Sequence, residues 1–318
     1  MKAIVVREFG DPDVMKLVDT PTPTPGPGQV LVRVKAAGVN PADAYARSGL
    51  TKPPLPFTPG TDAAGTVESI GSGVTHVKQG QRVYTARSLS GTYAEYALAL
   101  SQQVQPLPDR VSFSQGAGVF VPYATAWRAL NHFARARQGE TLLIHGSSGG
   151  VGIAAAQTAR AMGMTIIGTA GTDKGRELAL KEGAHHVVDH HAKGYPEEIL
   201  KLTGGRGVDV ILEMLANVNL GADLKLLAPR GRVVVIGSRG EATITPRDLM
   251  GKDGAIYAML LWNISEEDAV KTHAALAAGL ENGTLRPVVG LELKLAEAPA
   301  AHRKVMEPGA FGKIVLLT

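Results

Sequence analysis

The chain has 318 residues, a length that predicts two domains of about 150 residues each. Hydrophobic residues make up 44% of the sequence and charged residues 19%, a balance that supports a buried core and excludes a disordered chain. The absence of cysteine excludes disulfides, thiolate metal ligands and a cysteine nucleophile, and it fits a reducing compartment. The net charge of +4, with no dense basic run, favours a small phosphate-bearing ligand over nucleic acid as the primary partner.

The N-terminal residues and the most apolar stretch of the chain indicate where the protein is expected to be located. Residues 1–7 enter a strand-like run directly and lack the regions of a signal peptide. The most apolar stretch, residues 255–262, is far shorter than the ~20 residues that span a bilayer. We therefore expect a soluble, cytoplasmic protein without a membrane partner.

The first third of the chain is rich in Gly and Pro and contains short runs typical of strands. Residues 30–36 alternate apolar and charged side chains, as a half-buried strand does, and residues 66–70 and 82–85 are similar. Turn-forming pairs such as Pro59-Gly60 separate these runs. Together they predict a compact, mostly antiparallel β domain.

Helices and strands alternate after Val121-Pro122, which predicts a doubly wound parallel sheet. We expect helices over residues 123–137, 151–162 and 265–280, and strands over 141–145, 165–169, 186–189, 208–213, 232–236 and 313–317. The last strand is expected to return to the first domain. The predicted domains are therefore a β domain of residues 1–121 and 264–318, and a nucleotide-binding domain of residues 122–263.

A glycine-rich segment, Gly146-Ser147-Ser148-Gly149-Gly150-Val151-Gly152, lies between a predicted strand and a predicted helix. Small residues let backbone N–H groups approach a pyrophosphate, and a helix N-terminus favours the anion. The spacing differs from G-x-G-x-x-G, and a glycine-rich turn that binds nothing is the alternative interpretation. The flanking strand and helix favour dinucleotide binding.

The end of the next strand predicts which dinucleotide is bound. NAD-selective sites place an acidic residue there, ~20 residues beyond the glycines. In this chain Gly171 leaves space at the strand tip and Lys174 supplies a cation, so we predict NADPH over NADH. Asp173 lies past the tip, and Lys174 is equally compatible with a solvated lysine at a helix start.

Several segments resemble a known family. They include Gly38-Val39-Asn40-Pro41, residues 91–97 and residues 147–152, and the most specific are residues 213–220 and 235–240. On these segments the chain resembles, nearly end to end, the zeta-crystallin-like NADPH:quinone oxidoreductases, a zinc-independent branch of the medium-chain dehydrogenase/reductase superfamily. The resemblance implies an α/β fold, with a Rossmann doubly wound parallel sheet and a mostly β GroES-like substrate domain. It also implies a homodimer or homotetramer, formed through an edge strand of the nucleotide domain.

The resemblance also implies which residues contact NADPH. These are Ser148, Gly149, Gly150 and Val151 at the pyrophosphate, Gly171, Lys174 and His190 at the adenosine 2′-phosphate, Asn219, Ile236, Gly237, Ser238 and Arg239 at the ribose and nicotinamide, Met259, Leu260 and Leu261 over the nicotinamide, and Asn40 and Thr125 near the nicotinamide and substrate. The chain departs from the family after Arg47-Ser48-Gly49, where a frequent Tyr is missing. That departure affects the expected shape of the substrate mouth.

The sequence does not predict a metal site. Zinc-dependent relatives use Cys and His ligands and a Gly-His-Glu segment, where this chain has Gly60-Thr61-Asp62. The pairs His185-His186 and His190-His191 flank one short strand, whose alternate residues face opposite ways, so they are not expected to converge. We expect no metal.

The expected activity is transfer of reducing equivalents from NADPH to an electrophilic acceptor, a quinone or an activated enone. Asn40 is expected to donate a hydrogen bond to the acceptor carbonyl, and Tyr45 is a candidate proton donor alongside water. The alternatives are a turn-forming Asn before Pro41 and a packing role for Tyr45. No catalytic triad and no paired-carboxylate site stands out.

Two other functions compete with quinone reduction. The first is reduction of enones or enoyl thioesters by NADPH on the same scaffold, for which the missing Tyr is mildly unfavourable. The second is binding of AU-rich RNA as a secondary activity, which the resemblance suggests. The sequence lacks the aromatic stacking set of an RNA-binding surface.

Overall fold

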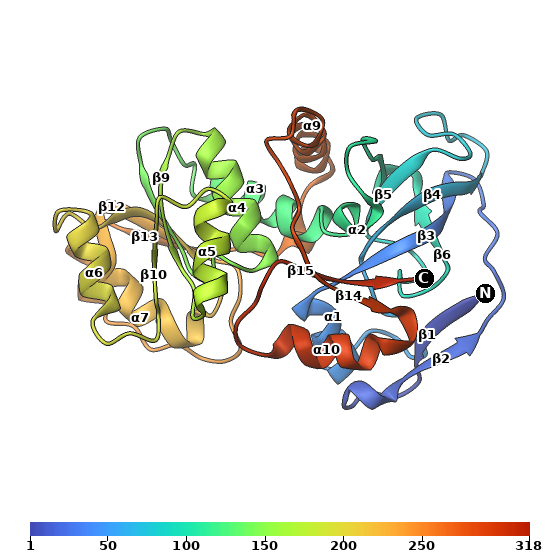
Figure 1. Cartoon of the computed structure of the whole chain (residues 1–318), viewed down its shortest axis with the longest axis horizontal. Helices are drawn as coiled ribbons and strands as arrows, with labels where there is room; N and C mark the ends of the chain where they lie inside the picture. The colour runs from blue at the N-terminus through green and yellow to red at the C-terminus, as the bar shows by residue number, and fades with distance from the viewer. The chain divides into compact units, whose positions relative to one another are not determined.

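The computed structural model describes residues 1–318 and divides them into two units (Figure 1). The units are Met1–Val121 with Ala277–Pro308 and Gly312–Thr318, and Pro122–Leu276 with Gly309–Phe311. The second unit thus takes in residues 264–276, which the sequence pattern assigned to the β domain. No helix combines the length and the apolar composition needed to cross a membrane.

The first unit is built on a mostly antiparallel sheet, as predicted. Its strand order is β14-β15-β3-β4-β5-β7, and β6 also pairs with β3. Only β14 and β15 run parallel to each other within this sheet. Its strands are β3 (Gln29–Val39), β4 (Asp62–Ile70), β5 (Arg82–Ala86), β6 (Tyr96–Leu100), β7 (Val104–Pro106), β14 (Val289–Lys294) and β15 (Lys313–Leu317).

The closing strand β15 pairs antiparallel with β3, so the predicted return of the chain to the first unit is confirmed. Strands β1 (Lys2–Val6) and β2 (Met15–Asp19) form a separate antiparallel pair. Inward-facing side chains such as Ile4, Val34 and Leu316 share one apolar core, which holds these strands together. The helices of this unit are η1 (Pro12–Val14), α1 (Pro41–Ser48), η2 (Ser101–Gln103), α2 (Phe113–Gly116), η6 (Leu295–Glu297) and α10 (Ala298–Met306), and α9 (Glu266–Asn282) contains residues of both units.

The second unit contains a six-stranded, fully parallel sheet, which confirms the predicted fold class. The order β10-β9-β8-β11-β12-β13 places the switch of winding direction between β8 and β11, where open α/β sheets bind ligands at the carboxyl ends of the strands. Strand β13 was not predicted. The strands are β8 (Thr141–Ile144), β9 (Thr165–Thr169), β10 (His186–Val188), β11 (Val208–Glu213), β12 (Leu227–Val235) and β13 (Ala255–Ala258).

Two groups of helices cover this sheet. In one group α4 contacts α3 and α5, and in the other α7 contacts α6 and α8. In Figure 1, α4 and α5 lie on one side of β9 and β10, and α6 and α7 lie on the other. Apolar layers therefore cover both faces, as a parallel sheet requires. The helices are α4 (Gly150–Ala161), α5 (Asp173–Lys181), α6 (Tyr195–Leu202), α7 (Ala216–Leu226), α8 (Pro246–Met250) and η5 (Leu261–Asn263), preceded by η3 (Phe120–Ala124), α3 (Thr125–Arg128) and η4 (Ala129–Phe133).

The helix predicted over residues 123–137 has different bounds in the structure. Helical residues run from Phe120 to Phe133, as successive π-helical, α-helical and π-helical segments. The helix ends early because Arg135 adopts a φ of 48°, which turns the backbone out of the helix.

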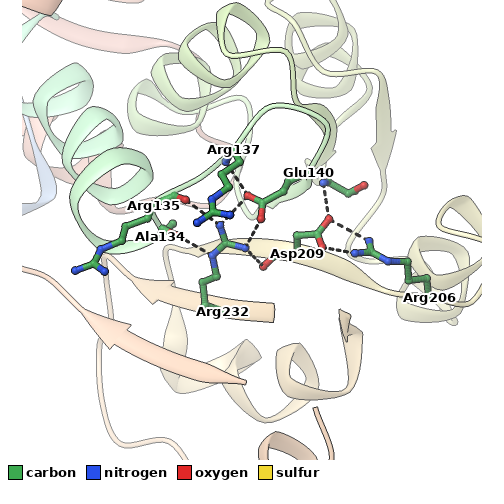
Figure 2. Close-up of polar contacts among 8 residues, drawn as sticks. Ala134, Arg135, Arg137, Glu140, Arg206, Asp209 and Arg232 are labelled. Carbon is green, nitrogen blue, oxygen red and sulfur yellow. Dashed lines mark hydrogen bonds and ion pairs between the residues drawn. The ribbon is translucent and has the colours of Figure 1, made fainter. Parts of the chain in front are cut away.

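The carbonyl groups exposed at this turn are bound by Arg232 of β12 (Figure 2). All five N–H donors of its guanidinium have acceptors: the Glu140 carboxylate at 2.8 and 2.7 Å, and the carbonyl oxygens of Ala134, Arg135 and Asp209. A two-pronged contact between guanidinium and carboxylate is both strong and directional. The Arg232 side chain is only 13% exposed, so this contact anchors the turn to the sheet.

Replacing Arg232 with Lys is expected to lower the free energy of unfolding by about 2 kcal/mol. An ammonium cannot make the two-pronged contact, and it leaves carbonyl groups and a partly buried carboxylate short of donors. The matched control is Arg303→Lys, in an ion pair whose side chains are 48% and 74% exposed, where the change should stay below about 0.5 kcal/mol. Urea denaturation measures both, and equal losses of stability would contradict the anchoring role.

Candidate functional site

The glycine-rich segment forms a tight loop between β8 and α4, and the end of β9 holds it in place. The Ser147 N–H donates to the Thr169 carbonyl at 2.9 Å, and the Gly146 N–H donates to Thr169 Oγ1 at 3.2 Å. At Gly152 a Cβ would lie 2.4 Å from the Gly146 carbonyl oxygen, so only glycine lets the helix start this close to the loop. The loop is therefore fixed between β9 and α4.

The first turn of α4 is open to a ligand. Its N-cap residue is Gly149, and no side chain caps the helix. The first N–H groups of a helix have no acceptors within it, and they carry a partial positive charge. The Ser148 hydroxyl is turned away, because it donates to the Ala310 carbonyl at 2.7 Å. The N–H groups of Gly150 and Val151 thus offer a place for an anion, and their contact with a pyrophosphate stays a prediction.

The side chains of His190 and His191 lie next to Gly171, which comes just after β9. A Cβ at Gly171 would lie 2.7 Å from His190 Nε2 and 2.5 Å from His191 Nε2, so glycine lets both rings lie close to the backbone. The two rings are 4.4 Å apart between centroids. The sequence pointed to His190 alone. Its neighbour His191 was missed, although its adjacency in the chain was the available signal.

Charged side chains at the start of α5 follow Gly171 in the chain. We call Lys174, Gly171, His190 and His191 together the corner around Gly171. Lys174 is exposed and makes no ion pair, which fits both a ligand-binding cation and a solvated lysine at the helix start. Asp173, the one acidic side chain that favoured NADH, pairs with Arg176. Arg176 also contacts Asp189 at 3.1 Å. The corner around Gly171 therefore presents imidazole and ammonium groups, whereas the nearby carboxylates of Asp173 and Asp189 are paired.

The remaining predicted contacts of the second unit follow β11, β12 and β13. Segments 236–239 and 259–261 come after β12 and β13, which are parallel neighbours. The first segment is fixed to the end of β11, because the Ile236 N–H donates to the Glu213 carbonyl at 2.8 Å. Asn219 of α7 reaches the same residue, with Nδ2 3.3 Å from Glu213 Oε1. The structure thus brings these residues to the same edge of the sheet as the glycine loop.

Thr125 lies in α3, where it is buried. One turn later, Arg128 donates to the Leu260 carbonyl and, at 3.0 Å, to the Asn263 carbonyl. Arg128 thereby fixes the segment that is predicted to cover the nicotinamide. The sequence contained no signal for this role, because the acceptors are backbone carbonyls far along the chain.

In the first unit, Asn40 is buried between charged side chains. Its Nδ2 lies 3.1 Å from Asp62 Oδ2, and its Oδ1 accepts a hydrogen bond from the Lys313 ammonium. Lys313 also pairs with Asp62 at 3.1 Å, and both side chains are almost fully buried. These contacts orient the Asn40 amide, whose side chain also hydrogen-bonds Asp43. The sequence did not indicate Lys313, which comes from the other end of the chain.

A second buried chain of polar groups begins at Asp43 of α1, the helix whose N-cap is Asn40. Asp43 Oδ2 accepts from the Asn40 N–H at 2.8 Å and lies 3.3 Å from the Tyr93 hydroxyl, which is 3.2 Å from His302 Nε2. Burial raises the pKa of Asp43 to about 7, although the Asn40 N–H and the Lys313 charge act in the opposite direction. Tyr45, on the same helix, is only half-buried, and its candidate role as proton donor stays a prediction.

The structure also contains a buried histidine with two carboxylates, which corrects the expectation that no paired-carboxylate site exists. His145 Nε2 lies 2.8 Å from Asp223 Oδ1 and 3.6 Å from Glu213 Oε2. His145 follows β8 and Glu213 ends β11, and these two strands are neighbours despite their separation in sequence. Burial raises the pKa of both carboxyls to about 7 and lowers that of His145.

One ligand atom from each residue of the His145 cluster lies within 4.8 Å of the other two, a spacing that a cation could also use. Nitrogen and oxygen donors of this kind suit several divalent ions. The absence of a metal from this protein therefore stays a prediction.

Comparison with known proteins shows similarity over both units. The family model for an alcohol dehydrogenase GroES-like domain matches residues 26–109, and the model for a zinc-binding dehydrogenase matches residues 150–277. Human quinone oxidoreductase is 48% identical over 321 residues, which cover 100% of this chain and 98% of the human protein.

Solved structures agree with this similarity. Escherichia coli quinone oxidoreductase complexed with NADPH has a TM-score of 0.90 at 30% identity, with 100% of each chain covered. A structure described as an NAD-dependent alcohol dehydrogenase has a TM-score of 0.93 at 30% identity, with the same coverage. Both of these solved structures therefore share the fold of this chain over its full length.

Replacing Asp43 with Asn is expected to flatten the pH dependence of stability. The folded carboxyl, with a pKa of about 7 against an ordinary 3.8, keeps a proton that the unfolded chain has released. Asp43 therefore contributes stability at low pH that is lost as the pH rises through its folded pKa, by up to about 1.4 kcal/mol per pH unit. An Asn retains an acceptor for the Asn40 N–H without this titration.

Urea denaturation of the wild type and Asp43→Asn at about pH 5 and about pH 7 measures the difference. The variant should lose less stability than the wild type between these values. Parallel stability curves would contradict the raised pKa.

Proposed function

We propose that this chain, which belongs to the zeta-crystallin-like quinone oxidoreductase family of the medium-chain dehydrogenase/reductase superfamily, transfers reducing equivalents from NADPH to quinones without zinc. One observation carries the proposal: an uncapped helix N-terminus follows a glycine loop beside a corner of imidazole and ammonium groups. Such a surface suits a pyrophosphate with a nearby phosphate.

Four features support NADPH over NADH. The tip of β9 carries Gly171 in place of an acidic residue that would bind a ribose hydroxyl. His190 and His191 face that glycine, and Lys174 has no competing ion pair. Asp173 is neutralised by Arg176. The solved relative from Escherichia coli is complexed with NADPH.

Two features support a zinc-independent reaction. The chain has no cysteine, so the thiolate ligands that zinc favours are missing. In the segment Gly60-Thr61-Asp62, the carboxylate is paired with the Lys313 ammonium, so a side-chain cation already neutralises its charge. The words "zinc-binding" in the matched model describe that model, and we do not carry them over to this chain.

Bound NADPH would supply the hydride, and the chain would orient it and the acceptor. We place the acceptor carbonyl beside Asn40, whose side-chain amide would donate to the oxygen as negative charge develops on it. Lys313 and Asp62 hold the Asn40 amide in one orientation, so little reorganisation is needed at that moment. A quinone is already electrophilic, so it does not need a metal to polarise it. Tyr45 or water would deliver the proton.

We further propose a cytoplasmic homodimer or homotetramer that forms through an edge strand of the second unit. Strand β13 lies at one edge of that sheet, and Tyr257 within it is exposed. An unpaired edge offers backbone groups to a second copy. Light scattering of the purified protein measures its mass in solution.

Turnover with matched acceptors tests the proposed activity. With NADPH, 1,2-naphthoquinone should be reduced faster than crotonyl-CoA, and NADPH should be preferred over NADH. Faster reduction of crotonyl-CoA would favour the enoyl-thioester alternative and contradict the proposal. Metal analysis of the active enzyme should detect no stoichiometric zinc.

Replacing Lys174 and His190 together with Ala is expected to raise KM for NADPH at least about tenfold, because each removed group costs a charge-assisted contact to the 2′-phosphate. The KM for NADH should change little. The matched control is Lys181→Ala, which removes an exposed lysine from the last turn of the same helix. Equal effects on both cofactors would place the 2′-phosphate elsewhere.

A further inference from the structure

We propose that His145, Thr169 and Asp223 form a directional chain of hydrogen bonds that positions the glycine loop to receive the dinucleotide. None of the three is expected to touch the cofactor, so they are positioning residues. The inference rests on the proposed function of the loop, and it assigns a role to a cluster that the proposed mechanism does not use.

The chain of contacts runs from the buried carboxylate to the loop without a break. Asp223 Oδ1 lies 2.8 Å from His145 Nε2, and His145 Nδ1 lies 3.4 Å from Thr169 Oγ1. Thr169 Oγ1 in turn accepts from the Gly146 N–H at 3.2 Å. All three side chains are buried, with exposures of 1%, 4% and 0% in that order, so water does not compete for these contacts.

With His145 neutral and Asp223 ionised, one arrangement of protons satisfies every group in this chain. An ionised Asp223 accepts a hydrogen bond, so the Nε2 of a neutral His145 must carry the proton. Nδ1 is then an acceptor, and it can take the hydroxyl hydrogen of Thr169. The Thr169 oxygen is left with its lone pairs free for the Gly146 N–H. Each donor thus has one acceptor, and the direction of the chain is set by Asp223.

Glu213 allows Asp223 to keep a negative charge in a buried place. Glu213 Oε2 and Asp223 Oδ2 are both buried and have no partner among the heavy-atom contacts. Burial raises the pKa of both carboxyls to about 7, and a proton held on Glu213 would favour the ionised form of Asp223. One proton held on Glu213 therefore serves both oxygens and leaves Asp223 as the acceptor for His145.

The position of Gly146, which Thr169 fixes, also affects the N-terminus of α4. Gly146, whose N–H binds Thr169, also accepts from the Gly149 N–H through its carbonyl at 3.1 Å. Gly149 is the N-cap of α4. The Thr169 hydroxyl thus lies two hydrogen bonds from the open N–H groups that would bind the pyrophosphate, and its loss would let the loop relax away from them.

Thr169→Val removes the hydroxyl at nearly constant volume, and Thr169→Ser keeps it. The matched control is Thr158→Val, which removes another buried hydroxyl from this unit, one that binds the Ala154 carbonyl within α4 at 2.7 Å. NADPH fluorescence titration measures the dissociation constant of each variant, and thermal denaturation measures its stability. Thr169→Val is expected to weaken NADPH binding about tenfold, whereas Thr169→Ser and Thr158→Val stay within about twofold of the wild type.

A double-mutant cycle tests whether Asp223 acts through Thr169. Asp223→Asn should weaken NADPH binding in the wild-type background and cause no further loss in the Thr169→Val background. Additive losses would overturn the chain, and so would wild-type affinity in Thr169→Val or equal weakening by Thr158→Val. A stoichiometric metal bound by the His145 cluster would also overturn it. If the wild type itself fails to bind NADPH, the proposed function fails, and that result is distinct from these.

Discussion

The close packing of the glycine loop against the carboxyl end of β9 is the contact on which the candidate site depends. Thr169 holds the loop through its carbonyl and its hydroxyl, and Gly152 lets α4 begin directly beyond it. Any side chain at Gly152 would push the helix away, and the open N–H groups would no longer face a common point. The binding surface is therefore made of backbone, and its precision comes from the residues behind it.

Buried charge is handled in a similar way in each unit. In the first, Lys313 and Asp62 form an ion pair, and both form hydrogen bonds with the Asn40 side chain. In the second, His145 lies 2.8 Å from Asp223 and 3.6 Å from Glu213, behind the loop. Uncompensated charge in such places would be costly, so the pairing and the hydrogen bonds both stabilise these groups and fix their orientation. Both groups lie beside residues that are proposed to contact ligands, and we infer that their rigidity keeps those residues in the orientation needed for binding.

Much of the fold could be predicted from the sequence because its signals are local. The alternating pattern of residues 30–36 identified β3, and the glycines after β8 identified the loop. Strand β13 was missed because its residues continue into further apolar residues without a turn signal. The helix that ends at Phe133 was predicted too long, since the left-handed conformation of Arg135 has no signature in the sequence.

The candidate site was predictable where one segment carries it and hidden where distant segments meet. Gly171 and His190 could be predicted from the strand tip and the resemblance, whereas His191 was missed although it is adjacent to His190 in the chain. The meeting of His145 with Glu213 and Asp223 depends on β8 and β11 being neighbours, which strand order alone decides. Lys313 reaches Asn40 for the same reason, through the pairing of β15 with β3.

The most direct test of the account is a calorimetric titration of the purified chain with NADPH and, separately, with NADH. The account predicts one site per chain and an affinity for NADPH at least about tenfold higher than for NADH, a difference of about 1.4 kcal/mol. Tighter binding of NADH would contradict the assignment of the corner at Gly171. Binding of neither dinucleotide would contradict the central claim that the open start of α4 holds a pyrophosphate.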